Sequence, residues 1–161
     1  MNDFQFSTGA EAEKIPGYLL WQVSKLWQRH LNEALKGLGL SSTQAIILIN
    51  VPRLNQEKRT VTQMLLAEVT KIDRVTLSQS IRTLERNGLI QRITASSNKR
   101  AYHVTLTPTG SKVAMQAMQH IISAHQTFFS PLAEQTDKYV TLTQTLIQAN
   151  NKMEETNESV R

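Results

Sequence analysis

Apolar residues recur every three or four positions between residues 15 and 38, a spacing that predicts a long amphipathic helix. Two glycines, Gly37 and Gly39, mark its expected end. The sequence SSTQ that begins at Ser41 then fits a capping box, because the serine oxygen can accept from a first-turn amide while the glutamine reaches back. We therefore expect a second helix that starts there and ends near Pro52.

The next segment has the pattern of a helix-turn-helix. A charged connector, residues 53–59, leads to Thr62, which can cap a short helix. After a brief turn, Asp73 can cap a second helix over residues 74–86, which an Asn-Gly pair ends. Two short helices joined by a tight turn form a helix-turn-helix, in which the exposed face of the second helix determines what the motif can bind.

That second helix has two unlike faces. Its apolar stripe consists of Leu77, Ile81 and Leu84, at the steps of a buried helix face. The opposite side has no acidic residue before Glu85 and, apart from one valine, carries side chains that can donate to phosphates or read base edges. These are Arg74, Val75, Thr76, Ser78, Gln79, Arg82, Thr83 and Arg86. An ordinary solvated face is the alternative, but it would carry more mixed charge, so the pattern favours DNA.

Two short alternating runs follow, at residues 91–94 and 102–106. Ile93 lies on one side of the alternation and Tyr102, Val104 and Leu106 lie on the other, as in two half-buried strands. The polar, basic tip between the runs makes them a hairpin. A hairpin that follows a helix-turn-helix is a winged helix, and this hairpin is its wing.

Two further helices complete the predicted order. Thr107-Pro108 places a capping residue before a proline at the first helical position, and that helix reaches about Phe129. Ser130-Pro131 repeats the signal before a last helix over residues 132–149, and a polar tail follows. The expected fold is mainly α, a winged helix-turn-helix in the order α-α-α-α-β-β-α-α.

The charge of the chain is concentrated in its middle. The net charge is +5, but residues 53–103 hold ten basic and four acidic residues, which gives +6 there and leaves −1 for the rest. A basic segment in a nearly neutral chain suggests a local surface for a polyanion, and a solvated charged surface is the alternative.

Composition excludes several other functions. The chain has no cysteine, so disulfides, thiolate metal sites and cysteine-based peroxide sensing are ruled out. No apolar run approaches the roughly 20 residues that span a bilayer, and the N-terminus lacks the build of a signal peptide, so we expect a soluble, cytoplasmic protein without a membrane partner.

No catalytic constellation is visible. There is no phosphate loop, nucleophile elbow or pair of carboxylates, so we do not expect an enzyme. The histidines are interpreted as structural or surface residues rather than metal ligands, and we expect no metal or cofactor; they are His30, His103, His120 and His125.

Five short motifs in this order resemble the MarR family of bacterial transcriptional regulators, over about residues 15–149. Each is weak alone, but their combined order and spacing are specific. They are Leu40-Ser41-Ser42-Thr43-Gln44, Leu66-Ala67-Glu68, Asp73-Arg74, Leu84-Glu85-Arg86-Asn87-Gly88-Leu89-Ile90 and Leu106-Thr107-Pro108-Thr109-Gly110. The resemblance implies an obligate homodimer whose first and last two helices interlock, with one helix-turn-helix per subunit.

The predicted organisation follows from these elements. Residues 1–12 are a flexible N-terminus, 13–38 and 108–150 a helical dimerisation region, 40–107 the winged-helix DNA-binding region, and 151–161 a polar tail. The outer helices carry wide apolar stripes that would cover little of a small winged-helix core, so packing on a second copy gives a physical reason for them. The alternative is that the stripes pack only within the chain.

Each part of the winged helix has an expected role on double-stranded DNA. The helix over residues 74–86 would enter the major groove, where Val75, Thr76 and Gln79 read bases. The residues expected to contact the DNA backbone are Thr60, Thr62, Arg74, Ser78, Arg82 and Arg86.

The wing residues are Asn98, Lys99 and Arg100. The resemblance implies aspartate, any residue and arginine at the wing tip. Arg100 matches that arginine, whereas Asn98 stands in place of the aspartate, so the ion pair that would orient the arginine is replaced by an amide.

Two questions stay open. A small aromatic effector, a ligand class that the resemblance implies, could lie among residues of the first and fifth helices, or these residues could form dimer core; they are Tyr18, Trp21, Trp27, His30, Met115 and Met118. The function expected is a homodimeric repressor on a pseudo-palindromic operator. The alternatives are a transcriptional activator or a winged-helix interaction module such as an antirepressor.

Overall fold

The computed structural model describes residues 14–95 and 98–158, and the side chains of residues 14–93 and 102–152. The expected flexible N-terminus, residues 1–12, lies outside the described residues. The chain divides into two compact units, one that ends at Ala124 and one that begins at His125, and each is described by itself.

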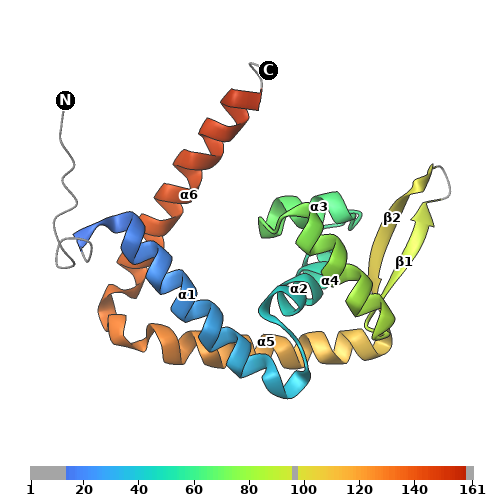
Figure 1. The fold of residues 1–161 in the computed structure, drawn as a ribbon, viewed down its shortest axis with the longest axis horizontal. Coiled ribbons are helices and arrows are strands. Elements are labelled where there is room, and N and C mark those ends of the chain that lie inside the picture. Colours follow the sequence, from blue (N-terminus) through green and yellow to red (C-terminus); the bar gives the residue numbers. More distant parts are fainter. Residues whose placement is uncertain (1–13, 96–97, 159–161) are drawn as a thin grey trace. The chain divides into compact units, whose positions relative to one another are not determined.

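The secondary structure follows the order expected from the sequence, so the mainly α, winged helix-turn-helix fold is confirmed (Figure 1). Two short 3₁₀ segments are added to it. The elements are α1 (Pro16–Leu35), η2 (Lys36–Leu38), α2 (Ser42–Gln56), α3 (Gln63–Thr70), α4 (Arg74–Arg86), β1 (Ile90–Ala95), β2 (Asn98–Leu106), α5 (Pro108–Phe129), η3 (Ser130–Gln135) and α6 (Thr136–Glu158).

Local hydrogen bonds start the helices where the sequence indicates. The Ser41 hydroxyl accepts from the Gln44 amide at 3.2 Å, and the Gln44 side chain accepts from the Ser41 amide at 3.0 Å, which completes the expected capping box. The Thr62 hydroxyl accepts from the Leu65 amide at 3.1 Å at the start of α3. Each cap satisfies an amide that has no partner within its own helix, and thereby fixes the residue at which the helix begins.

Helix α2 does not end near Pro52, as the sequence had indicated, but continues to Gln56 with the proline inside it. A proline inside a helix removes one backbone hydrogen bond, at a cost of roughly 3 kcal/mol. The helical path beyond it keeps Val51 and Leu54 fully buried, each worth roughly 1.5 to 3 kcal/mol. The free energy gained by burying Val51 and Leu54 therefore outweighs the cost of a proline inside the helix.

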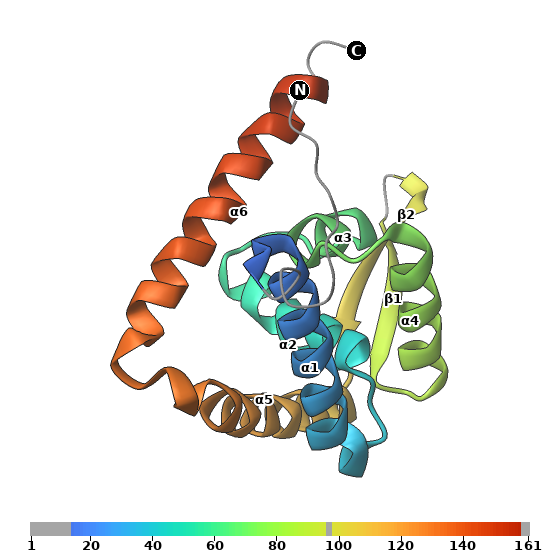
Figure 2. The same ribbon diagram turned by 60° about the vertical axis from the view of Figure 1, so that its left-hand side comes forward.

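The core lies mainly inside the winged helix. Figures 1 and 2 show α3 and α4 next to each other against α2, with the hairpin beside α4. Their buried side chains are almost all aliphatic, and no buried polar or charged residue occurs among the described ones. The fully buried larger side chains are Leu35, Ile47, Leu48, Val51, Leu54, Leu66, Leu77, Ile81, Leu84, Ile90 and Val104.

The hairpin register confirms the expected strand faces. Ile90 pairs with Leu106, Arg92 with Val104 and Ile93 with His103, so Ile93 points away from the face that carries Val104. The ladder shifts register between Thr94 and Ala95.

A tight junction joins the wing to α5. The Thr107 hydroxyl donates to the Gly88 carbonyl at 2.7 Å and accepts from the Gly110 amide at 2.9 Å. Gly110 passes so close to the residue that precedes β1 that an added Cβ would lie 1.8 Å from the Leu89 carbonyl oxygen. Only glycine fits there without a shift of backbone.

The second unit corrects the expected bounds of the last helix. The segment after Ser130-Pro131 is the 3₁₀ segment η3, in which Ala133 has φ 46° and ψ −123°, so α6 begins at Thr136 rather than at residue 132. It ends at Glu158, beyond the expected residue 149. Lysine, methionine and glutamate in this polar stretch are strong helix formers, and so polarity alone did not indicate a frayed end.

Among the described residues no single helix is long and apolar enough to span a membrane. Residues Pro16–Leu38 and Ser42–Gln56 reach that length and composition only as a pair, across a bend of 76°.

Substitution of Gly110 tests the junction between the wing and α5. An alanine in an open helix position would be more stable than glycine by about 1 kcal/mol. At Gly110 the added methyl group meets the Leu89 backbone, so we expect Gly110→Ala to lower the free energy of unfolding by roughly 1 to 3 kcal/mol. Urea unfolding measures it, and Gly37→Ala, where no atom lies within 4 Å of the added Cβ, is the matched control. Equal stability of the two variants would contradict the close approach.

Candidate DNA-binding surface

Helix α4 begins at a fully formed cap. The Asp73 carboxylate accepts hydrogen bonds from the amides of Val75 at 3.1 Å and Thr76 at 2.9 Å. The backbone and side-chain hydrogen bonds from Thr76 are the main causes that hold the pKa of Asp73 below its ordinary value. Because the Thr76 side chain also bonds the Asp73 carboxylate, its methyl group is the part of that side chain left to contact another molecule.

The two faces of α4 are separated as expected. Leu77, Ile81 and Leu84 are buried in the core. The opposite side is open: Val75 is 67% exposed, and the basic and amide side chains around it are also exposed. Four residues at steps of four, three and four positions form one exposed stripe, namely Val75, Gln79, Arg82 and Arg86.

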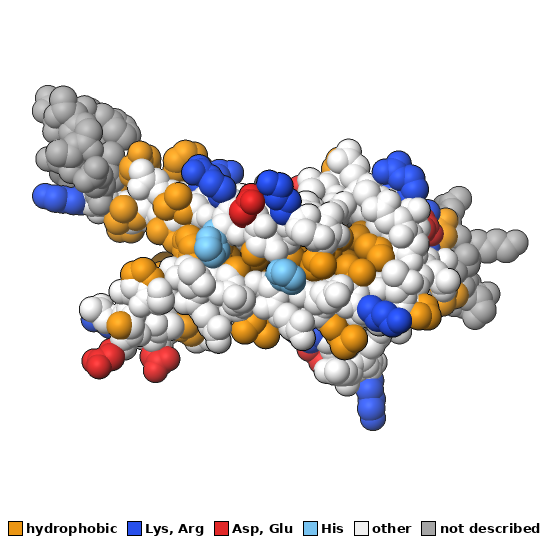
Figure 3. Space-filling view, turned by 90° about the horizontal axis from the view of Figure 1, so that it is seen from below, with side chains coloured by type: hydrophobic (Ala, Val, Ile, Leu, Met, Phe, Trp, Pro, Cys, Tyr) orange, Lys and Arg blue, Asp and Glu red, His pale blue; other side chains and the backbone are white. Residues whose placement is uncertain are grey.

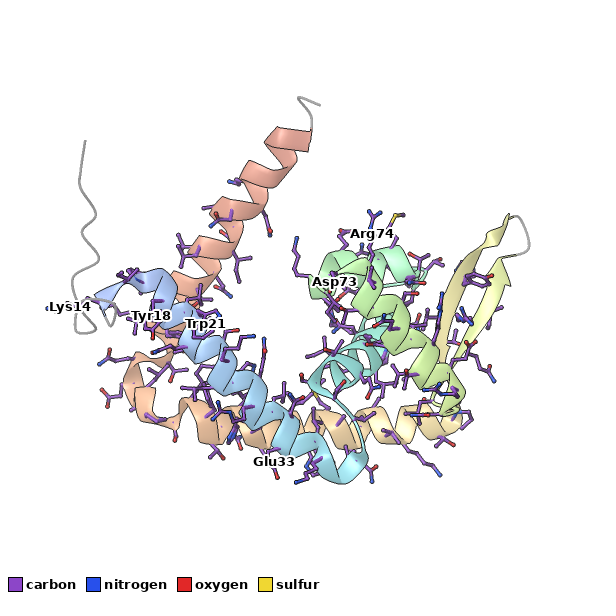
Figure 4. The ribbon with its side chains drawn as sticks, in the orientation of Figure 1. Lys14, Tyr18, Trp21, Glu33, Asp73 and Arg74 are labelled. Atoms are coloured by element: carbon purple, nitrogen blue, oxygen red, sulfur yellow. The ribbon has the colours of Figure 1, made fainter. Side chains whose placement is uncertain are left out.

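Of the remaining residues predicted on this helix, Arg74 and Thr76 are exposed at its N-terminus and Ser78 is half-buried. Figure 4 shows Asp73 and Arg74 where α4 starts, close to α3. The structure thus collects the predicted base-reading residues on one surface. Their contacts with DNA stay a prediction.

The segment before α3 joins the helix-turn-helix to the wing. The Val61 carbonyl accepts from the Val104 amide at 2.8 Å, and Thr62 forms an isolated bridge with His103. Thr60 is exposed and Thr62 half-buried, with its oxygen already accepting the α3 cap bond. Both predicted phosphate contacts therefore lie beside β2 at the N-terminus of α3, where free amides attract an anion.

The wing tip is only partly described. Asn98, Lys99 and Arg100 belong to β2 by their backbone, and Asn98 pairs with Ala95. Their side chains lie outside the described residues, so their role on DNA and the effect of Asn98 stay predictions.

A contact that the sequence did not indicate joins the recognition helix to the wing. The Arg92 Nε of β1 donates to the Glu85 Oε2 of α4 at 2.8 Å, and its Nη2 lies 2.5 Å from the same oxygen. The hydrogen bond and charge of Arg92 lower the pKa of Glu85, and the same bond raises the pKa of Arg92. The only acidic residue of α4 is thereby paired, so it does not offset the basic face.

The residues expected for an effector lie on two helices of the first unit. On α1, the Tyr18 and Trp21 rings lie 6.2 Å apart, and the Trp27 and His30 rings 6.3 Å apart. Figure 4 shows Tyr18 and Trp21 near the start of α1, and Trp21 is 56% exposed. Met115 and Met118 are exposed on α5. A ligand pocket among these residues stays a prediction, and no group of three or more potential metal ligands occurs in the described part of the chain.

An aliphatic core, a helix-turn-helix with a basic exposed face and a hairpin wing together define a winged-helix DNA-binding transcriptional regulator. A family model described as a winged helix DNA-binding domain matches residues 40–110. An uncharacterized HTH-type transcriptional regulator of Bacillus subtilis, YdcH, is 32% identical over 115 residues, 71% of this chain and 78% of the relative. The chain belongs to the MarR family of winged helix-turn-helix regulators.

Solved structures agree with this assignment. The C80S mutant of MarR from E. coli, complexed with operator DNA, is 26% identical with a TM-score of 0.72, over 88% of this chain and 99% of that one. S. aureus MepR in a DNA complex, at 22% identity and a TM-score of 0.74 over 84% and 98% of the two chains, shares the fold. So does CouR from Rhodococcus jostii RHA1, bound to p-coumaroyl-CoA, at 20% identity and a TM-score of 0.70 over 88% and 94%.

The Asp73 cap makes a prediction about pH. Its pKa is lowered on folding, so the charge contributes stability above the ordinary value of 3.8, and this contribution is lost as pH falls through the folded pKa. We expect Asp73→Ala to lower the melting temperature at neutral pH more than Asp73→Asn, which keeps the acceptor. The difference between wild type and Asp73→Asn should close in acid. Thermal melts across pH measure it, and a difference that persists in acid would contradict the assigned charge.

Proposed function

We propose that the protein is a homodimeric repressor that binds a pseudo-palindromic operator, with α4 of each subunit in a major groove. The observation that carries the proposal is the exposed stripe of α4, Val75, Gln79, Arg82 and Arg86, opposite a fully buried aliphatic face. A helix held in this way presents its side chains without rearrangement. Operator binding by the E. coli relative supports the same use of the fold.

The division of labour follows from side-chain chemistry. Gln79 can bond an adenine through two groups, and Val75 or the Thr76 methyl can contact a thymine methyl. Arg74, Arg82 and Arg86 supply positive charge, and Ser78, Thr60 and Thr62 supply hydroxyl donors, all for the DNA backbone. The wing, Asn98 to Arg100, would add a contact to the minor groove or the flanking phosphates.

Large apolar side chains left open in both units support a dimer. On α1, Leu20, Trp21 and Leu26 are exposed, and Leu142 and Leu146 of α6 are 57% and 60% exposed. Figure 3 shows hydrophobic side chains at the surface on one face of the chain. Side chains this apolar, repeated on helices outside the winged-helix core, are what a second copy would cover.

A mobility shift assay distinguishes a DNA-binding regulator from an interaction module. It uses fragments of the genome that encodes the protein, at two salt concentrations. Binding should weaken steeply as salt rises, because phosphate contacts release counterions. A chain that binds no fragment at low salt would contradict the proposed function. An operator that overlaps a promoter then gives repression as the simplest outcome, and a reporter gene distinguishes repressor from activator.

Gln79→Ala tests the base-reading assignment. We expect relaxed preference at one position of each half-site, with a loss of roughly 1 to 3 kcal/mol in binding free energy. Selection of bound duplexes from a random pool gives the preference at every position. Gln56→Ala, at the exposed C-terminal end of α2, is the matched control and should leave the profile unchanged. An unaltered profile for Gln79→Ala would remove this residue from the reading set.

Charge on the open face of α6 tests the dimer. Leu142→Lys combined with Leu146→Lys places two charges on one helix face, so we expect the sedimenting mass to fall from two chains to one and DNA affinity to fall with it. Gln144→Lys, on the opposite side of the same helix, is the control. A double variant that still sediments as two chains would show that α6 does not form the interface.

A further inference from the structure

Arg92 holds together three elements of the winged helix: it bonds Glu85 of α4, belongs to β1, and places its guanidinium carbon 5.4 Å from the centre of the Tyr102 ring of β2. We propose that Arg92 is a positioning residue, which fixes the wing against the recognition helix and thereby sets DNA affinity without contacting DNA itself. The inference rests on the proposed DNA binding.

The geometry commits the guanidinium to the protein. Two of its nitrogens, Nε and Nη2, lie within hydrogen-bond distance of the same Glu85 oxygen, and its guanidinium carbon lies over the Tyr102 ring. Arginine is suited to such a site because its fork is planar and stacks on aromatic faces. Both side chains of the ion pair are about one third exposed, at 31% and 33%, so the pair is shielded from water on most of its surface.

The wing needs such an attachment at this point along the strands. Its base is anchored in the core by Ile90 and Val104, but Ile93 and Tyr102 farther out are exposed. A two-stranded hairpin has little stability of its own without a packed face. The segment before α3 already holds β2, through the bond from the Val104 amide to the Val61 carbonyl and the bridge between Thr62 and His103. In the described part of the hairpin, the bond from Arg92 to Glu85 is the outermost hydrogen bond to α4, so it restrains β1 against the recognition helix.

The direction in which Glu85→Gln changes DNA affinity distinguishes a positioning role of Arg92 from direct contact with DNA. Glu85 carries a negative charge beside the DNA-binding face, so if Arg92 were a phosphate contact held back by Glu85, then Glu85→Gln would release it and strengthen binding. If Arg92 positions the wing, Glu85→Gln loses the charged partner and weakens binding, although it removes a repulsive charge.

The experiment uses the full chain and a duplex that the wild-type protein selects from a random-sequence pool. We expect Glu85→Gln to raise Kd by about two- to fivefold, the upper range for a partly exposed ion pair. The control is Glu68→Gln: Glu68 is an exposed acid of α3 with no ion pair among the described residues, and its removal should leave Kd unchanged or slightly lower. Glu85→Gln that binds as tightly as wild type, or more tightly, overturns the proposal.

Arg92 variants supply the second readout. Arg92→Lys keeps the charge but loses the fork and the stack, so it should weaken binding about as much as Arg92→Gln, with the salt slope unchanged in both. Tyr102→Phe keeps the ring and should bind like wild type, whereas Tyr102→Leu should not. Near-normal binding by Arg92→Lys together with a reduced salt slope for Arg92→Gln would make Arg92 a phosphate contact instead.

A hydroxyl-radical footprint then tells positioning from a general loss of stability. Positioning predicts that protection of the flanks, where the wings lie, is lost while central protection by α4 remains. Flank protection equal to that of wild type, at matched occupancy of the duplex, would overturn the assignment. If the wild-type chain selects no duplex, the proposed function itself fails. If the wild-type chain binds DNA and the Glu85 and Arg92 variants bind equally well, only the positioning role of Arg92 fails.

Discussion

Burial of one aliphatic stripe, Leu77, Ile81 and Leu84, is the constraint on which the DNA-binding surface depends. Each such side chain gains roughly 1.5 to 3 kcal/mol when it leaves water, far more than any rearrangement of surface charges could recover. Because the stripe fixes the rotation of α4 about its axis, Val75, Gln79 and Arg82 face outward. The surface is therefore set by the core, and the polar residues need no interactions of their own to be presented.

Short-range chemistry explains why much of this was visible in the sequence. The caps at Ser41, Thr62 and Asp73, and the two faces of α4, depend on residues within four positions of each other, so spacing alone predicts them. The strand faces follow from alternation in the same way. For such features the local pattern and the tertiary packing favour the same conformation.

The features that could not be predicted depend on contacts between distant segments. Pro52 is tolerated inside α2 because Val51 and Leu54 are buried. The bond from Arg92 to Glu85 depends on the strand register, which the local sequence pattern does not predict. The glycine at position 110 is required by the backbone of Leu89, far away in sequence. The start of α6 differs from the expected one because the backbone of Ala133 is not helical, although alanine itself gives no signal for a break. The individual DNA contacts remain hypotheses, since a face indicates what it can bind but not which atoms meet.

The proposed function places α4 of each of two subunits in a major groove. Methylation protection of guanine N7, an atom that lies in the major groove, tests it most directly on a duplex that the chain binds. We expect two protected clusters related by two-fold symmetry, with centres about 10 base pairs apart or a multiple of that. Salt-dependent binding with no protected major-groove position, or with one unpaired cluster, would contradict it.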